Sequence, residues 1–339
     1  MASAQNIVWR QVENKIQGVP VELRALEANE VRLKITHSGL CHSDVFYISS
    51  GMVLGHEGVG IVEEVGSAVT EFKIGDRAGG GYLRDSCGKC KYCLTGRDIW
   101  CYNRNIYGEK DYNTGTFSKY YIGVETFLHK IPDELSSSDA APLQCAGATV
   151  YSALLDVISS GTRVGIVGIG GLGHLAIQFA DKLGAEVVVF STSADKEEEA
   201  KKFGAKEFYL LSEPEKVKEP IDVLVLTGAK HPDFSRFMTK EILARTGTIV
   251  PLTADTHDLQ LPSLTMFFAG YNIRSSLVAS RKIHSDMLRF AAKHGIKPVI
   301  EEFPMDEGGF AAALDRLNSG KVRYRAVLAA QIGPPCAEK

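Results

Sequence analysis

Residues 164–180 read VGIVGIGGLGHLAIQFA, and this stretch decides the fold of the central part of the chain. An apolar run leads into Gly168, Gly170 and Gly173, which form a G-x-G-x-x-G frame, and an amphipathic segment follows. In dinucleotide-binding folds these glycines permit a tight turn, close approach of a pyrophosphate, and packing of the helix against the sheet. The motif alone is weak in a chain with 33 glycines, because a glycine-rich turn without a ligand has the same letters.

The segments around this loop alternate between buried strands and polar or amphipathic helices. Strands are predicted at 163–169, 186–191, 221–228 and 247–253, and helices at 171–184 and 196–204, each ending in a glycine. Strands and helices in this alternation are typical of a doubly wound parallel sheet, the Rossmann architecture. The loop therefore has the context that dinucleotide binding requires.

The parts of the chain before and after this region have a different pattern of apolar and polar residues. Short β-type runs with glycine turns occupy 31–40, 58–67, 75–83 and 117–123, which indicates a mostly β domain. After residue 280 the pattern predicts a helix (281–295), a strand (297–304), a helix (309–320) and a final strand (325–330). We therefore expect a discontinuous catalytic domain, 1–151 and 280–339, interrupted by a Rossmann domain at 152–279.

Composition excludes several classes of function. The formal net charge of the 339 residues is −3, so the chain carries no basic field that would attract nucleic acid or an anionic membrane. The N-terminal residues lack the apolar run of a signal peptide, and no stretch approaches the roughly 20 apolar residues of a membrane span. A reducing cytoplasm is the expected location, where cysteine clusters indicate metal or redox sites before disulfides.

Four of the seven cysteines lie within residues 87–101, CGKCKYCLTGRDIWC. Cys87, Cys90, Cys93 and Cys101 follow a C-x2-C-x2-C-x7-C spacing. Four thiolates close a tetrahedral zinc shell and leave no position for substrate, so this spacing favours a structural zinc. An iron–sulfur cluster and unliganded thiols are the alternatives.

A second set of possible ligands is dispersed along the chain: Cys41 in GLCHSD, His56 in GHEGVG and Cys145 in LQCAGATVY. Each residue alone has an ordinary structural explanation as a core or hydrogen-bonded side chain. Beside the cysteine cluster and the glycine loop, the three together are typical of an open catalytic zinc site.

These motifs resemble those of the zinc-dependent medium-chain alcohol dehydrogenases. GHEGVGIVEEVGSAV (55–69), the cysteine cluster and the glycine loop occur in that family's order, and CAGATVYSAL (145–154), 168–180 and VRYRAVL (322–328) are most similar to its cinnamyl-alcohol-dehydrogenase-type branch. The resemblance runs nearly end to end. It implies a GroES-like catalytic domain beside the Rossmann domain, a homodimer, and a zinc- and NADP-dependent enzyme that interconverts a small-molecule alcohol and an aldehyde or ketone, acting as an aldehyde reductase.

The resemblance also implies roles for individual residues. Cys41, His56 and Cys145 would bind the catalytic zinc, Glu57 would be an alternate or neighbouring ligand, Asp44 would orient the His56 ring, and Ser43 would begin a proton path. The cysteine cluster would bind a second, structural zinc. The cofactor-binding candidates are Thr149, Gly168, Gly170, Gly171, Leu172, Gly173, Ser191, Thr192, Ser193, Lys196, Thr227 and Arg323.

The turn after the second Rossmann strand indicates NADP(H) rather than NAD(H). NAD sites usually carry an acidic residue there, whereas this strand runs into Ser191, Thr192 and Ser193 with Lys196 nearby. Hydroxyls and a lysine suit a 2′-phosphate. A polar helix-capping turn without a cofactor role is the alternative, and Asp195 opposes the interpretation.

Three features depart from the family's pattern. One is Ile106, which stands where plant cinnamyl alcohol dehydrogenases carry a pocket tryptophan, so cinnamyl substrates are not predicted. Phe46 stands where relatives usually carry the outer histidine of a proton relay, and only fourteen residues, 42–55, separate Cys41 from His56. Either the loop is short in this protein or the sequence lacks a segment. A zinc-free quinone or enoyl reductase and a catalytically decayed NADPH-binding protein are the alternative functions.

Overall fold

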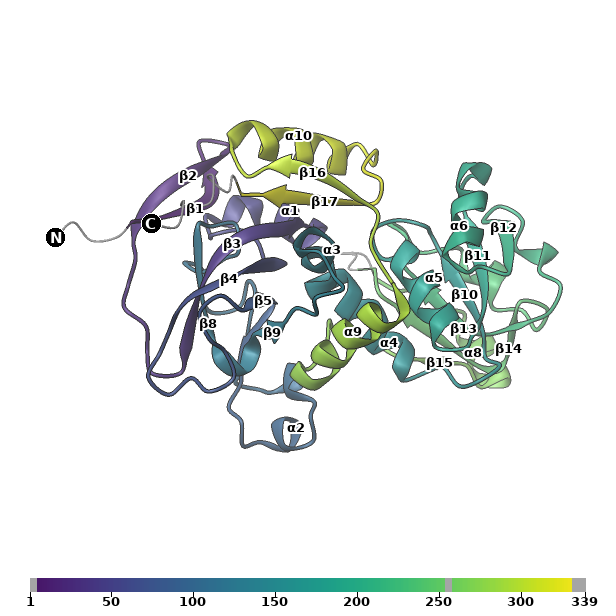
Figure 1. The fold of residues 1–339 in the computed structure, drawn as a ribbon. Helices are drawn as coiled ribbons and strands as arrows, with labels where there is room; N and C mark the ends of the chain where they lie inside the picture. Colours follow the sequence, from purple (N-terminus) through teal and green to yellow (C-terminus); the bar gives the residue numbers. More distant parts are fainter. Residues whose placement is uncertain (1–4, 254–257, 331–339) are drawn as a thin grey trace. The chain divides into compact units, whose positions relative to one another are not determined.

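The computed structural model describes residues 5–253 and 258–330, which form two compact units. Unit 1 consists of Met1–Cys145 and Ala279–Lys339, and unit 2 consists of Ala146–Val278. Figure 1 follows the chain by colour, and the yellow-green C-terminal elements return to the unit that the purple and blue elements build. Residues 331–339 of the predicted second catalytic segment lie outside the described residues.

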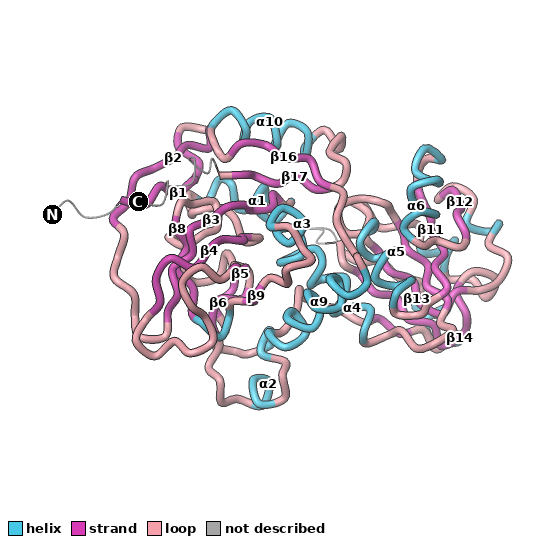
Figure 2. Tube along the Cα trace, in the orientation of Figure 1, coloured by secondary structure: helices cyan, strands magenta, loops and turns pink. Residues whose placement is uncertain are grey.

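Unit 1 is built on a seven-stranded sheet in the order β16-β17-β3-β4-β5-β9, and β8 pairs with β3 beside this path. The strands are β3 (Glu30–Leu40), β4 (Gly58–Val65), β5 (Arg77–Gly80), β8 (Tyr120–Val124), β9 (His129–Lys130), β16 (Ile300–Pro304) and β17 (Arg325–Ala329). Two-stranded sheets are formed by β1 (Gln5–Val12) with β2 (Lys15–Glu22) and by β6 (Leu83–Asp85) with β7 (Asn105–Ile106). The predicted mostly β character of this part is confirmed, as the magenta strands of Figure 2 show.

The last segment of the chain completes this sheet. Strand β17 pairs antiparallel with β3 and parallel with β16, so its register sets Ala326 opposite Leu40. Figure 1 shows yellow β17 beside purple β3. Arg325 is the first residue of β17, and the pairing with β3 places it close to the carboxyl end of β3. Strand β3 ends at Leu40, and Cys41 is the next residue.

Short helices fill the connections of unit 1. They are α1 (His42–Tyr47), α2 (Lys91–Leu94), α3 (Ser137–Pro142), α9 (Arg281–His294) and α10 (Glu307–Asn318), with a 3-10 turn η2 (Asp98–Trp100) and a π-helical turn η4 (Leu143–Gly147). Phe310 of α10 is fully buried and packs on Phe117 and Trp9, which ties the last helix to the first strand. Burial of such aromatic rings contributes on the order of 2–3 kcal/mol each.

Unit 2 contains a six-stranded sheet in the order β12-β11-β10-β13-β14-β15, and every pair in it is parallel. The strands are β10 (Arg163–Val167), β11 (Glu186–Ser191), β12 (Glu207–Leu210), β13 (Ile221–Leu226), β14 (Leu243–Pro251) and β15 (Asn272–Ile273), and the helices are α4 (Ala148–Leu155), α5 (Gly173–Lys182), α6 (Glu197–Phe203), α7 (Phe234–Phe237) and α8 (Ser263–Ala269). All five residues of β10 are buried, as expected of a central strand covered on both faces. The predicted doubly wound parallel sheet is confirmed.

The sequence patterns did not predict two strand regions, the β1–β2 hairpin and β12. The β1–β2 hairpin turns at Glu13 and Asn14, whose φ angles of 47° and 64° belong to a two-residue hairpin turn. A Glu-Asn turn is a weaker signal than Asn-Gly, and this hides the hairpin. Strand β12 is a half-buried edge strand of four residues, too short for its alternation to stand out.

Candidate active site

Four possible ligands from distant parts of the chain converge in unit 1. Cys41 precedes α1, His56 and Glu57 precede β4, and Cys145 lies in η4. One ligand atom from each residue lies within 4.8 Å of the others. The short Cys41–His56 spacing therefore does not prevent the two residues from meeting.

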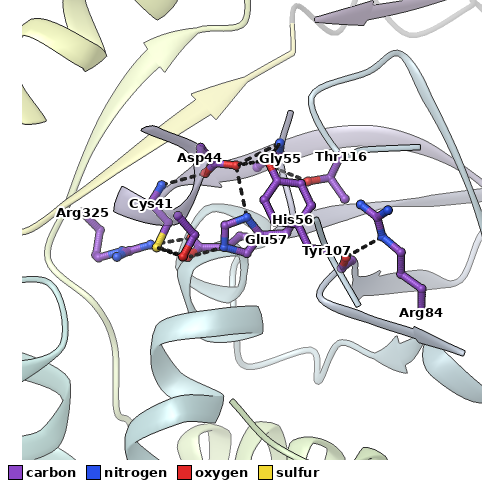
Figure 3. Close-up of polar contacts among 12 residues, drawn as sticks. Cys41, Asp44, Gly55, His56, Glu57, Arg84, Tyr107, Thr116 and Arg325 are labelled. Atoms are coloured by element: carbon purple, nitrogen blue, oxygen red, sulfur yellow. Dashed lines mark hydrogen bonds and ion pairs between the residues drawn. The ribbon is translucent and has the colours of Figure 1, made fainter. Parts of the chain in front are cut away.

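Asp44 fixes the orientation of His56 (Figure 3). The Nδ1 atom of His56 donates to the Asp44 carboxylate at 3.1 Å, so the predicted contact between these residues is present. The same carboxylate accepts from the Tyr107 hydroxyl at 2.8 Å and from the backbone N–H groups of Gly55 and Cys41 at 3.0 and 2.9 Å. Because an ionised carboxylate can only accept hydrogen bonds, Nδ1 of His56 carries the proton of this bond. Nε2 is then the ring nitrogen that faces the two cysteines.

The donor set fits a soft divalent cation such as zinc. Nε2 of His56 is buried and has no hydrogen-bond partner in the part of the chain that the structure describes. Hydrogen bonding with the Cys145 thiol holds the pKa of Cys41 well below its ordinary value, and His56 lowers it further. Burial lowers the pKa of His56, but Asp44 and Cys41 outweigh burial and raise it to about 10. A zinc ion would take the place of these protons, since it binds thiolate and neutral imidazole.

Glu57 is held by a residue that sequence reasoning missed. Nη2 of Arg325 lies 2.6 Å from Glu57 Oε2, and both side chains are buried. Burial raises the pKa of Glu57 to about 7, and the nearby Arg325 charge counteracts the rise. Gly39 makes room for this carboxylate, because a Cβ there would stand 1.9 Å from Oε2.

A signal for Arg325 was present in the sequence. The stretch 322–328 contains two arginines, and the family resemblance implies a role only for Arg323. Arg325 opens a strand whose next three residues are buried, and an arginine in that position needs a carboxylate partner. Glu57, in an apolar glycine-rich stretch, has the same need for a cation.

The four-cysteine group, Cys87, Cys90, Cys93 and Cys101, also converges. Its sulfur–sulfur distances include 3.5 Å (Cys87–Cys101), 3.6 Å (Cys90–Cys93) and 4.0 Å (Cys87–Cys93). Four sulfurs around zinc at about 2.3 Å would stand roughly 3.8 Å apart, whereas a disulfide requires about 2.05 Å. Backbone N–H donors, that of Lys89 first, lower the pKa of the Cys87 thiol to about 6. This group suits a closed metal site.

The glycine loop joins β10 to α5 in unit 2. Gly168 has φ of +93°, and a Cβ there would meet Gly228 Cα at 2.8 Å. A Cβ on Gly173 would meet the Gly168 carbonyl oxygen at 2.0 Å. A Cβ on Gly170 would meet nothing within 4 Å, so this glycine borders open space of the kind a pyrophosphate needs. Gly171 and Leu172 complete the turn before α5, and the Thr227 hydroxyl lies 2.9 Å from the Val167 and Gly168 carbonyl oxygens.

The turn after β11 lies beside the glycine loop. Nζ of Lys196 donates to the Ile169 carbonyl at 3.1 Å. Thr192 and Ser193 are exposed, and the Ser193 hydroxyl donates to Asp195, whereas Ser191 is buried at the end of β11. Two of the three predicted hydroxyls are therefore open to a ligand on this turn.

The remaining predicted residues lie in different surroundings. Ser43 Oγ is 3.8 Å from Cys41 Sγ, and Phe46 is 68% exposed with its ring edge-on to Tyr47. Thr149 is half-buried in α4 of unit 2. Arg323 belongs to unit 1, where its backbone N–H donates to Glu301 at 2.7 Å. Among the described residues no helix is long and apolar enough to cross a membrane.

Comparisons with known proteins identify the family of this chain. The family model "Alcohol dehydrogenase GroES-like domain" matches residues 27–133, and the model "Zinc-binding dehydrogenase" matches 171–293. A probable formaldehyde dehydrogenase of Bacillus subtilis is 37% identical over 331 residues, with 93% of this chain and 94% of that protein covered. The chain belongs to the zinc-dependent medium-chain alcohol dehydrogenase family.

Solved structures of family members have the same fold. A cinnamyl alcohol dehydrogenase of Sorghum bicolor superposes with a TM-score of 0.88 at 30% identity, covering 96% of this chain and 98% of that one. The CAD of Helicobacter pylori, complexed with NADP(H), superposes with a TM-score of 0.87 at 28% identity and the same coverage. The predicted combination of a GroES-like part and a Rossmann sheet is confirmed for this member of the family.

Proposed function

We propose that this protein is a zinc-dependent oxidoreductase that interconverts an alcohol and an aldehyde or ketone by hydride transfer with NADP(H), acting mainly as an aldehyde reductase. The observation that carries the proposal is the convergence of Cys41, His56 and Cys145 on one point, with His56 Nε2 buried and without a hydrogen-bond partner in the described residues. Three protein ligands leave a position open, which distinguishes a catalytic zinc site from a closed structural one.

Cys41, His56 and Cys145 would hold the catalytic zinc, and the four-cysteine group would hold a second zinc. When bound, the catalytic zinc supplies the Lewis acidity that polarises an alcohol or carbonyl oxygen. Asp44 keeps the proton of His56 on Nδ1 and so keeps Nε2 available. Glu57 is paired with Arg325, which favours a supporting role beside the ligands.

The proton and the cofactor would be handled by other residues. Ser43, beside Cys41, would carry the substrate proton outward, and Phe46 cannot continue that path through its own side chain. The glycine loop and Thr227, with Thr149 and Arg323, would bind the dinucleotide, and Thr192, Ser193 and Lys196 would bind the 2′-phosphate. Residues 1–151 with 280–339 would act as the catalytic domain, and 152–279 as the cofactor-binding domain.

We also propose a cytoplasmic homodimer. The six described cysteines are free, in keeping with a reducing compartment. Leu264, Phe267 and Phe268 of α8 are 74–78% exposed, and β15 beside them is an edge strand. A second copy of the chain would cover this apolar face, and sedimentation of wild type against Phe267→Glu would test it.

The direct test of function is a panel of aldehydes and alcohols assayed with NADPH and NADH, together with zinc quantification. Turnover of an aldehyde with NADPH and two zinc ions per chain are expected. An active protein without zinc would instead indicate a zinc-free reductase, and a binder of NADPH without turnover would indicate a decayed site.

The cofactor preference depends on the turn after β11. Thr192→Asp should shift the ratio of kcat/KM values toward NADH by about thirtyfold, or about 2 kcal/mol, because a carboxylate there repels the 2′-phosphate and loses a hydrogen bond. Thr192→Ser, which keeps the hydroxyl, is the matched control. Equal use of NADH and NADPH by the wild type would contradict the proposed role of this turn.

A further inference from the structure

Helix α9 begins against the loop 87–101 that carries the four-cysteine group, called the four-cysteine loop below. Its N-cap residue, Ser280, makes no capping bond with its side chain. Instead the buried carboxylate of Asp98, 183 positions away, accepts from the backbone N–H of Arg281 at 3.2 Å and from Nε of the same residue. A carboxylate at a helix N-terminus accepts from a free N–H donor and interacts favourably with the positive end of the helix dipole. Asp98 therefore anchors the start of α9.

Asp98 is part of the turn that presents a metal ligand. It opens η2, and its carbonyl oxygen accepts from the N–H of Cys101 at 3.0 Å. Cys101 is the last member of the four-cysteine group. The position of the α9 N-terminus is thus tied to the geometry of that group.

One turn into α9, His284 contacts Gln144, the residue directly before the candidate ligand Cys145. Its Nε2 lies 3.0 Å from Oε1 of Gln144, and because an amide oxygen can only accept, His284 is the donor. The His284 ring stacks on His129 at 3.8 Å, and His129 Nδ1 bonds the hydroxyl of Ser285 at 2.8 Å. Both imidazoles are buried, so packing and hydrogen bonding leave His284 little freedom.

Gln144 is the residue directly before Cys145. It lies in the π-helical turn η4, a rare geometry that is frequent at functional sites. The Gln144 side chain is fully buried, and its Nε2 donates to the Ala140 carbonyl at 3.0 Å. Gly79 lies close on another side, since a Cβ there would stand 2.8 Å from Gln144 Cδ. Holding Gln144 therefore holds the turn that presents Cys145.

We propose that the first turn of α9 links the four-cysteine loop to the catalytic ligand set, with His284 as a positioning residue for Cys145 that acts through Gln144. The inference rests on the proposed function in one respect, namely that Cys41, His56 and Cys145 bind a metal. Its consequence is that metal affinity at Cys145 depends on contacts made by Asp98 and His284, neither of which is a ligand.

The test compares His284→Leu, which removes the donor, with His284→Gln, whose Nε2 can replace it. Full-length proteins are titrated with zinc and Co²⁺ against a chelator, and the Co²⁺–thiolate absorption reports the sulfur ligands. His284→Leu should weaken metal binding at the Cys145 site about 10- to 100-fold, as loss of a supporting contact does, while the four-cysteine site keeps its metal. His284→Gln should recover most of the affinity, and His294→Leu, on the same helix beside Phe290, should bind as wild type.

Arg281→Gln tests the link from the other end and changes a side chain that is 32% exposed, so the protein should fold even if His284→Leu does not. A several-fold loss of affinity at the Cys145 site supports the link. Wild-type affinity and absorption in the folded Arg281→Gln variant, or in folded His284→Leu, would overturn it. If the wild type binds two zinc ions and turns over aldehyde, and these variants bind metal with wild-type affinity, only the link is refuted. If the wild type binds one zinc ion, the proposed function is refuted as well.

Discussion

Glu57 and Arg325 are buried and oppositely charged, so each side chain needs the other to compensate its charge. The two residues lie 268 positions apart and meet where β17 pairs with β3. Arg325→Met should lower the free energy of unfolding by about 3–5 kcal/mol, because it leaves a buried carboxylate without its partner. Urea unfolding measures this loss.

The double variant Glu57→Gln/Arg325→Met provides the control for this pair. Removing both charges should recover a large part of the loss, since a neutral amide needs no counter-charge. If the double variant is as unstable as Arg325→Met alone, the effect comes from lost packing and not from an unpaired charge.

Residue-level prediction is most direct where one motif identifies one residue. The zinc-ligand candidates and Asp44 come from short motifs, and the structure brings Asp44 to His56 and the four possible ligands to one point. Arg325 and Gln144 act through partners distant in sequence. The strand pattern indicates that Arg325 needs a buried carboxylate partner, but no local pattern identifies which carboxylate it is. Ser191 shows a different limit, because its burial depends on where β11 ends.

The glycine loop offers an element-scale test that separates cofactor binding from folding. A Cβ on Gly170 meets no protein atom within 4 Å, so Gly170→Ala should unfold at the wild-type temperature. If a pyrophosphate occupies that space, the added methyl should weaken NADPH binding at least about tenfold. Fluorescence titration with NADPH measures the affinity, and thermal unfolding measures stability.

Gly168→Ala is the contrasting variant for this loop. Its φ of +93° and its 2.8 Å approach to Gly228 should make it destabilising even without cofactor. NADPH binding by Gly170→Ala with wild-type affinity would remove the loop from the cofactor site.

The stacked pair of His129 on β9 and His284 on α9 should make unit 1 sensitive to acid. Burial, aided by the Arg281 charge, lowers the pKa of His129 to about 3, and burial lowers the pKa of His284 well below its ordinary value of 6.5. The unfolded chain therefore binds more protons below pH 6.5, and the stability that is complete above pH 6.5 is lost as the pH falls.

Each neutral histidine should contribute a loss of about 1.4 kcal/mol per pH unit below 6.5. Urea unfolding of wild type and His129→Phe at pH 7 and pH 5 measures the slope, and carboxylates that titrate in this range affect both proteins alike. The variant should show the shallower slope. Equal slopes would mean that the folded protein protonates the pair.

The elements that sequence patterns predicted well are those with a continuous apolar run or a clear helical repeat. Buried strands such as β10 and β13 and amphipathic helices such as α5 and α9 lie where periodicity places them. The π-helical turn η4 was not predicted, because no repeating pattern marks it. It directly follows Pro142, the last residue of α3, and it contains Gln144, whose side chain donates to the Ala140 carbonyl.

At the scale of the whole molecule, both groups of metal ligands belong to unit 1 and the glycine loop belongs to unit 2. The two ligand groups differ in completeness. The four-cysteine group closes a shell, whereas the second group leaves a position open if Glu57 stays with Arg325. Loss of the metal from the four-cysteine group and loss of the metal from the second group should therefore have different consequences.

Cys90→Ser should release one zinc per chain and lower the thermal stability, because a structural zinc contributes directly to folding. Cys145→Ser should release the other zinc and reduce kcat/KM at least about 100-fold, beyond the effect expected of a supporting contact, while the protein stays folded. NADPH affinity should remain at the wild-type value in Cys145→Ser, since the glycine loop lies in the other unit. Elemental analysis, steady-state kinetics and NADPH titration measure the three quantities. Retained turnover in Cys145→Ser, or one zinc in the purified wild type, would refute the division into a structural and a catalytic site.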